Sequence, residues 1–193
     1  MRHYCHTIGG AIEGLSASNC EVYLSEEGRA ASEPELLRRS LKGEEEKIYV
    51  GRRNKALARR WVEGLFNEGN LDVADEILTP DFVLHAPFDP EGLRGPEAVK
   101  QFVSAYRNAF PDGHTTIEDQ IAEGDKAVNR WTATGTHQGE FQGIAPTGNR
   151  VTFTGIDLIR VADGKLTEGW VELDALGWMQ QLGAIPEPGQ ERS

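Results

Sequence analysis

The chain has 193 residues, a formal net charge of −11, 38% hydrophobic residues and 26% charged residues. This length predicts one domain with some additional sequence, and the hydrophobic fraction is high enough for a packed core. An acidic surface repels phosphate backbones and anionic lipids, so we expect neither nucleic acid nor membranes as partners. No apolar run approaches the ~18 residues that span a bilayer, and no secretory signal is recognisable, which predicts a soluble, cytoplasmic protein.

The first 51 residues differ in composition from the rest of the chain. Gly, Ser and Glu dominate residues 1–51, and no apolar pattern there would bury a core, so we expect a poorly ordered N-terminal extension. Residues 52–186 are expected to form a single domain, and residues 187–193 a C-terminal tail. Both cysteines, Cys5 and Cys20, lie in the extension, so the domain is predicted to be stable without disulfides.

The first half of the predicted domain is mainly helical. After Asn54, apolar residues recur at three- and four-residue spacing, which is typical of an amphipathic helix that buries one face. Glycine and proline mark the ends of the elements. In chain order we expect a helix at 54–66, a short helix at 71–78, a strand at 82–86, a loop at 89–94 and a helix at 95–110.

The second half is predicted to consist mostly of strands. We expect strands at 115–122, 126–137, 150–161 and 165–173, followed by a helix at 175–182. Asp174 precedes this last helix and is a suitable cap for it. Helices followed by a meander of long strands indicate an α+β fold, in which a curved antiparallel sheet wraps on three N-terminal helices and encloses a pocket.

One carboxylate in this pattern points to chemistry. Alternate residues of the 150–161 strand share a face that is apolar except for Asp157. A three-residue hairpin loop at 162–164 would place Asp157 opposite Gly169, and the glycines at 155 and 169 would leave room beside it. Desolvation raises the pKa of a buried carboxyl, which suits it to general acid–base catalysis. The alternative is a structural Asp that is hydrogen-bonded to the backbone or to a polar neighbour.

Four other residues are candidates for binding a substrate. His85 lies on the first strand, Trp131 and His137 share a face of the second long strand, and Gln142 lies in a glycine-rich loop from which it could donate to a substrate carbonyl. The structural alternatives are a solvated His85 or Gln142 and a core Trp131. The five histidines show no ligand spacing, so we predict no metal site.

Several blocks of sequence occur together in an order typical of one known family. The blocks are Gly92-Leu93-Arg94-Gly95-Pro96-Glu97, the stretch from Gly135 to Gly148, Gly155-Ile156-Asp157, Asp163-Gly164-Lys165-Leu166 with Trp170, and Asp174-Ala175-Leu176-Gly177 with Gln180-Gln181-Leu182-Gly183. With these blocks, residues 52–186 resemble the SnoaL-like polyketide cyclases (ester cyclases) of the NTF2-like superfamily.

The resemblance implies an NTF2-like α+β cone, usually a homo-oligomer, that uses no cofactor. In the characterised cyclases it implies an intramolecular aldol condensation of a polyketide methyl ester, with one aspartate as general acid and base. Asp157 looks like the matching position, and Gln142 resembles a glutamine that assists in some members. Ile144 occupies the place at which an assisting histidine is expected, so we include it among the substrate-binding candidates.

These observations predict an ester cyclase that acts by acid–base chemistry on a small apolar carbonyl or polyketide-like compound. One alternative is a pocket that binds a small apolar molecule without turnover. Another is an epoxide hydrolase or an isomerase. Hydrolysis would require a second carboxylate and an arginine in the pocket, but Arg130 has the wrong strand parity. Isomerisation would require a tyrosine there, and Tyr106 is expected on a core helix face.

The predicted outer face of the sheet suggests how the chain assembles. Ile156, Leu158 and Trp170 alternate onto the face opposite Asp157. Since an apolar sheet face is unusual in water, we expect a homodimer through this surface.

Overall fold

The computed structural model describes residues 33–87 and 89–186. The two cysteines, most of the predicted extension and the predicted tail at 187–193 lie outside the described residues. Residues from Glu44 onward form one unit, and the segment of the first helix that ends at Gly43 belongs to another. In the part of the chain that the structure describes, no helix is both long enough and apolar enough to cross a bilayer.

The first helix is longer than predicted. α1 spans Glu33–Arg60, so the start expected at Asn54 is wrong, and residues from 33 onward in the predicted extension are helical. This stretch is rich in Glu, Leu, Lys and Arg, which favour helix, and it contains no proline after Pro34. A search for a buried apolar stripe misses such a helix because its large apolar side chains, such as Ile48 and Tyr49, are exposed.

α1 continues directly into a π-helix, η1, which spans Trp61–Asn67. The wider turn ends with the amide of Glu68 donating to the carbonyl of Glu63 at 2.9 Å. Short π-helical segments are frequent at functional sites. Here the segment buries Trp61 and Val62 on the side that faces the sheet.

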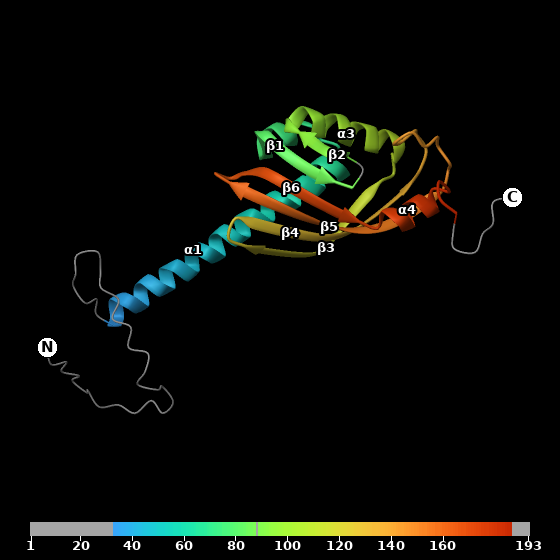
Figure 1. Ribbon diagram of the computed structural model, residues 1–193. Helices are drawn as coiled ribbons and strands as arrows, with labels where there is room; N and C mark the ends of the chain where they lie inside the picture. The colour runs from blue at the N-terminus through green and yellow to red at the C-terminus, as the bar shows by residue number, and fades with distance from the viewer. Residues whose placement is uncertain (1–32, 88, 187–193) are drawn as a thin grey trace, which may run out of the picture. The chain divides into compact units, whose positions relative to one another are not determined.

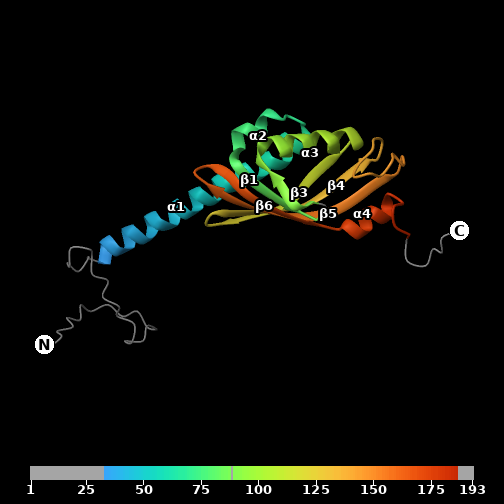
Figure 2. The same cartoon turned by 45° about the horizontal axis from the view of Figure 1, so that its top comes forward.

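The remaining helices frame the sheet. They are α2 (Asp72–Ile77), α3 (Gly95–Ala109) and α4 (Ala175–Gln181). Figure 2 shows α2 and α3 on one side of the sheet, and Figure 1 shows α4 beside the end of β5. The predicted cap of α4 is confirmed, since the Asp174 carboxylate accepts a hydrogen bond from the amide of Gly177 at 2.9 Å.

The sheet has six strands in the order β2-β1-β6-β5-β4-β3. Their bounds are β1 Leu78–Ala86, β2 Asp89–Arg94, β3 His114–Glu123, β4 Lys126–Thr136, β5 Arg150–Ala162 and β6 Lys165–Leu173. Neighbours are antiparallel except for β1 and β6, which are parallel. The loop expected at 89–94 is wrong, because these residues form an edge strand, where a proline such as Pro90 is tolerated.

The β5–β6 hairpin has a different register from the predicted one. Its loop contains two residues, Asp163 and Gly164, whose φ values of 49° and 79° suit a tight hairpin turn. An irregularity between Arg160 and Val161 adds a further shift, so Asp157 pairs with Val171 and not with Gly169. The shorter loop and the irregularity together shift the pairing by two residues, from Gly169 to Val171. An even shift keeps the side chains on the same faces, so Asp157 still lies on the predicted face of the sheet.

Candidate active site

A cavity of about 80 Å³ lies between the inner face of the sheet and the helices. Its wall comes from η1, α3, α4, five of the strands and the loop before β5. The wall is mostly aromatic and aliphatic, and Asp157 is its only charged side chain among the residues described. The lining residues are Trp61, Val62, Phe66, Leu84, Ala86, Phe102, Tyr106, Thr115, Trp131, Ala133, Phe141, Phe153, Asp157, Val171, Leu173 and Trp178.

The strand pattern explains why Asp157 faces this cavity. In β5, burial alternates residue by residue, and Asp157 points the same way as Phe153 and Ile159. Asp157 is only 4% exposed. Its Oδ1 accepts a hydrogen bond of 2.8 Å from the indole Nε1 of Trp131, which lies on the adjacent strand β4.

Burial changes the acidity of this carboxyl group. Desolvation raises the pKa of Asp157 to about 7, and hydrogen bonds from the side chains of Trp131 and Asn129 offset part of this rise. A carboxyl group that titrates near neutrality can both accept and return a proton at cellular pH. The sequence-based expectation of a raised pKa therefore agrees with the geometry.

Gly155 allows Trp131 to reach Asp157. The two residues are paired across β4 and β5, and a Cβ atom at position 155 would lie 2.3 Å from Cζ2 of the Trp131 ring. The space predicted beside Asp157 is therefore filled by the indole and is not free for a ligand. At Gly169, a Cβ atom would lie 3.0 Å from Cδ1 of Leu84, so this glycine also accommodates protein.

Asn129 is a buried polar residue that the sequence analysis did not select. It pairs with Asp157 across the two strands and is 0% exposed. Its Nδ2 donates to the carbonyl of Ala58 at 3.0 Å, and its Oδ1 accepts from Nε2 of Gln120 at 2.7 Å. The alternation of β4 could have revealed it, because Asn129 shares the inner face with Trp131.

Comparison with known proteins identifies the family. The family model described as SnoaL-like polyketide cyclase matches residues 56–182. The chain belongs to this family. It is 32% identical to nogalonic acid methyl ester cyclase of Streptomyces nogalater over 127 residues, which are 65% of this chain and 94% of the relative. It is 36% identical to aklanonic acid methyl ester cyclase DnrD of Streptomyces peucetius over 133 residues, 66% of this chain and 88% of the relative.

Solved structures agree with this membership. TsrD from Streptomyces laurentii superimposes with a TM-score of 0.62 at 32% identity, over 69% of this chain and 96% of that protein. The SnoaL-like α+β cone predicted from the sequence is confirmed, with helices packed on a curved sheet that does not close into a barrel.

The SnoaL-like domain places His85 away from the cavity. Its ring stacks on Trp170 with centroids 5.5 Å apart, and its Nε2 lies 3.1 Å from Oε1 of Glu168. The side chain is 44% exposed and is absent from the cavity wall described above. The interpretation of His85 as a solvated residue fits this position better than the pocket interpretation does.

His137 is buried but also does not line the cavity. It stacks on Phe110 with centroids 5.2 Å apart, and its Nδ1 lies 3.2 Å from Oγ1 of Thr147. Burial lowers the pKa of His137. Through these contacts, His137 helps to hold the loop that follows β4 in place.

The two candidates in that loop lie on a turn beside the cavity. Phe141 and Ile144 exchange backbone hydrogen bonds of 3.0 and 2.9 Å, and Gln142 and Gly143 between them have positive φ. Phe141 enters the cavity wall, whereas Gln142 is exposed at the tip and Ile144 packs behind the wall. Among the predicted binding residues only Trp131 joins Asp157 in the wall.

Tyr106 is a lining residue that the sequence analysis assigned to the core. The core assignment is confirmed, but the expectation that the pocket lacks a tyrosine is wrong, because the ring that packs among core aromatics also forms part of the cavity wall. A helical apolar stripe reports burial and does not distinguish a core contact from a pocket contact.

Among residues 33–87 and 89–186, no three His, Cys, Asp or Glu side chains come together in a way that could hold a metal ion.

Proposed function

We propose that the chain is a cofactor-free cyclase that closes a ring by acid–base chemistry on a small, largely apolar carbonyl compound of polyketide type. The observation that carries the proposal is Asp157, a carboxyl group with a pKa near 7 in an aromatic cavity. The matched relatives are named as methyl ester cyclases, which supports a polyketide methyl ester as the substrate class.

In the proposed reaction, the Asp157 carboxylate removes a proton from the carbon next to the substrate carbonyl. The electron pair of that C–H bond forms an enolate, whose carbon attacks a second carbonyl of the same molecule. The new C–C bond leaves an alkoxide, which takes the proton back from Asp157. Atoms and charge balance without a cofactor, and the cavity contributes by holding the two carbons in a reactive arrangement.

Turnover of a methyl ester tests this proposal. The full chain is incubated with nogalonic or aklanonic acid methyl ester in D₂O, and cyclised product and deuterium incorporation are followed by chromatography and mass spectrometry. We expect Asp157→Asn to reduce both rates by about 10²-fold or more, because the variant keeps the size of the side chain but has no general base.

Glu172→Gln is the matched control. Glu172 lies on β6 next to Val171, is exposed, and does not line the cavity, so its rate should stay within about twofold of the wild type. An Asp157→Asn variant that folds and retains full activity would contradict the proposal. If neither ester is turned over or exchanged but both bind, the alternative of a non-catalytic binding protein is favoured.

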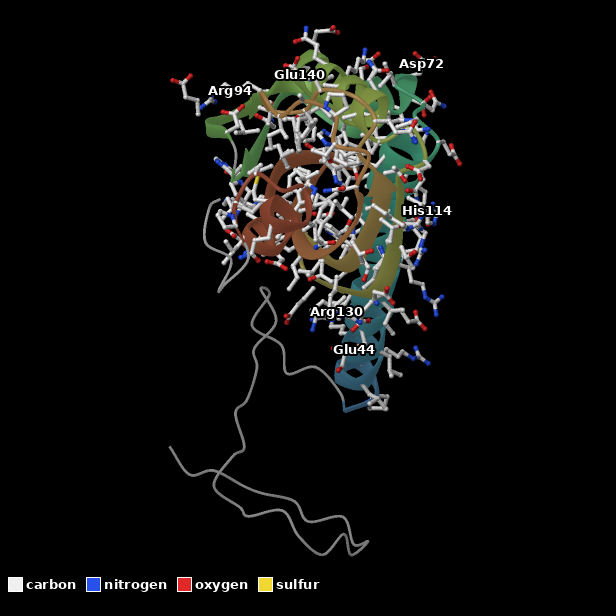
Figure 3. The ribbon with its side chains drawn as sticks, turned by 90° about the vertical axis from the view of Figure 1, so that its right-hand side faces the viewer. Glu44, Asp72, Arg94, His114, Arg130 and Glu140 are labelled. Carbon is white, nitrogen blue, oxygen red and sulfur yellow. The ribbon has the colours of Figure 1, made fainter. Side chains whose placement is uncertain are left out.

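The hydrolase alternative loses support from the cavity wall. Among the described lining residues there is no second carboxylate and no arginine to accompany Asp157. Arg130 is exposed and lies at the outside of the domain in Figure 3. An epoxide-opening reaction would lack the second acid–base partner there.

We propose a homodimer formed through the outer face of the sheet. Ile156 is 47% exposed on this face, and Trp170 and Leu158 are partly exposed beside it. Burial of this face would remove apolar area from water, and Ile156→Lys should therefore weaken the dimer. Sedimentation velocity at micromolar concentration should show a dimer for the wild type and a monomer for the variant. A wild-type monomer would contradict the proposal.

A further inference from the structure

Tyr106 places an unused hydrogen-bond donor in the wall of the cavity. The residue lies on α3, is 8% exposed, and lines the same cavity as Asp157. Within residues 33–87 and 89–186, no side chain or backbone group forms a hydrogen bond with its hydroxyl. A hydroxyl in the cavity wall that has no protein acceptor is available to donate a hydrogen bond to a ligand oxygen.

The surrounding rings hold Tyr106 in one orientation. Its ring meets Phe66 edge-on with centroids 5.9 Å apart and Phe141 edge-on at 6.0 Å, and it packs against Phe110 at 5.3 Å. Since these contacts come from η1, from the turn before β5 and from the end of α3, the ring is enclosed from several sides. A donor that is fixed before the ligand binds requires little reorganisation when charge develops next to it.

The hydroxyl also keeps its proton under ordinary conditions. Burial raises the pKa of Tyr106 to about 12, although the nearby Arg107 opposes this rise. At neutral pH Tyr106 is therefore a neutral donor, whereas Asp157 exists as both carboxylate and carboxylic acid. Tyr106 and Asp157 therefore have complementary roles available to them, one donating a hydrogen bond and one exchanging a proton.

We propose that Tyr106 donates a hydrogen bond to the substrate carbonyl oxygen and stabilises the enolate that forms when Asp157 removes the neighbouring proton. This inference rests on the proposed function. In the step concerned, the C–H electron pair becomes the C=C bond, the carbonyl π electrons move to the oxygen, and the Tyr106 proton stays on Tyr106. The site favours a planar, unsaturated carbonyl compound whose ring system packs among aromatic side chains and whose enolate oxygen accepts the hydrogen bond from Tyr106.

Ligand binding in an Asp157→Asn background tests this role without requiring turnover. Asn mimics the protonated base, and 4-nitrophenolate mimics the enolate with a planar ring and a charged oxygen. Binding is measured by absorbance titration of the full chain at a pH above the pKa of the ligand. We expect that adding Tyr106→Phe weakens 4-nitrophenolate binding roughly 10- to 100-fold, the value of a hydrogen bond to a charged group.

Two controls separate hydrogen bonding from packing. Nitrobenzene keeps the ring but lacks the phenolate oxygen, and its binding should change by less than about twofold between the same two proteins, because one hydroxyl adds little to apolar contact. Tyr49→Phe removes the hydroxyl of an exposed tyrosine on α1 that does not line the cavity, and it should leave 4-nitrophenolate binding unchanged. Tyr106→Phe should not lower the melting temperature, since it removes a hydroxyl that has no hydrogen-bond partner among the described residues.

The binding results test the role of Tyr106 separately from the role of Asp157. Equal weakening for both ligands would show that Tyr106 acts by packing, and would overturn the proposal. Unchanged phenolate binding in Tyr106→Phe, failure of 4-nitrophenolate to bind the Asp157→Asn protein, or an equal loss caused by Tyr49→Phe would also overturn it. The binding assay uses a protein that already lacks the proposed general base. If Asp157 is not the base, the turnover experiment shows it, and the binding assay is unaffected.

Discussion

Between pH 5 and pH 9, the wild-type chain is expected to lose about 3 kcal/mol of unfolding free energy that the Asp157→Asn variant retains. The cause is the difference between the folded pKa of about 7 and the unfolded value near 3.9. The native state binds this proton more tightly than the unfolded state. Stability from the protonated form is therefore complete below the unfolded pKa and is lost as the pH rises through the folded pKa.

The measurement is urea denaturation of both proteins at several pH values. All other titrating groups are shared, so the difference between the two stability curves isolates Asp157. We expect the variant to gain on the wild type as the pH rises and to level off above about pH 8. A variant that is less stable by the same amount at every pH would identify Asp157 as a structural hydrogen-bond acceptor, and its catalytic assignment would lose its main support.

Gly155→Ala is expected to destabilise the chain by about 3 kcal/mol, the upper part of the usual range for overpacking a core. The new Cβ atom would lie 2.3 Å from the Trp131 ring and 2.8 Å from the backbone carbonyl oxygen of Glu172, and the latter cannot turn aside. Displacement of the ring would also break its hydrogen bond to Asp157. Urea denaturation measures the loss.

A matched glycine gives the control for this prediction. Gly51 lies in α1, where a Cβ atom would be 3.8 Å from the nearest atom, the carbonyl oxygen of Ala122. Gly51→Ala should therefore stabilise by up to about 1 kcal/mol through helix propensity. In a Trp131→Phe background, the cost of Gly155→Ala should fall because the smaller ring does not reach as far. An unchanged cost would show that Trp131 is not the obstacle.

Register and edge pairing show where local patterns stop being informative. The sequence predicts the strand that became β5 and its alternation, but a turn one residue shorter and an irregularity at Arg160 moved the partner of Asp157 to Val171. Pairing depends on how the turn closes against the whole sheet, which no local window contains. Similarly, residues Asp89–Arg94 became an edge strand only because β1 offered them a partner.

The amino-acid sequence by itself determined the fold class, the inner face of β5 and the presence of one carboxylate on that face, because residue spacing encodes the periods of helix and strand. Tertiary structure alone decided which side chains meet in the cavity. It left His85, His137 and Gln142 outside the wall and brought Tyr106 into it from α3. It also filled the space at Gly155 with the ring of Trp131. Spacing reports which residues are buried, whereas contacts between distant elements determine what each buried residue faces.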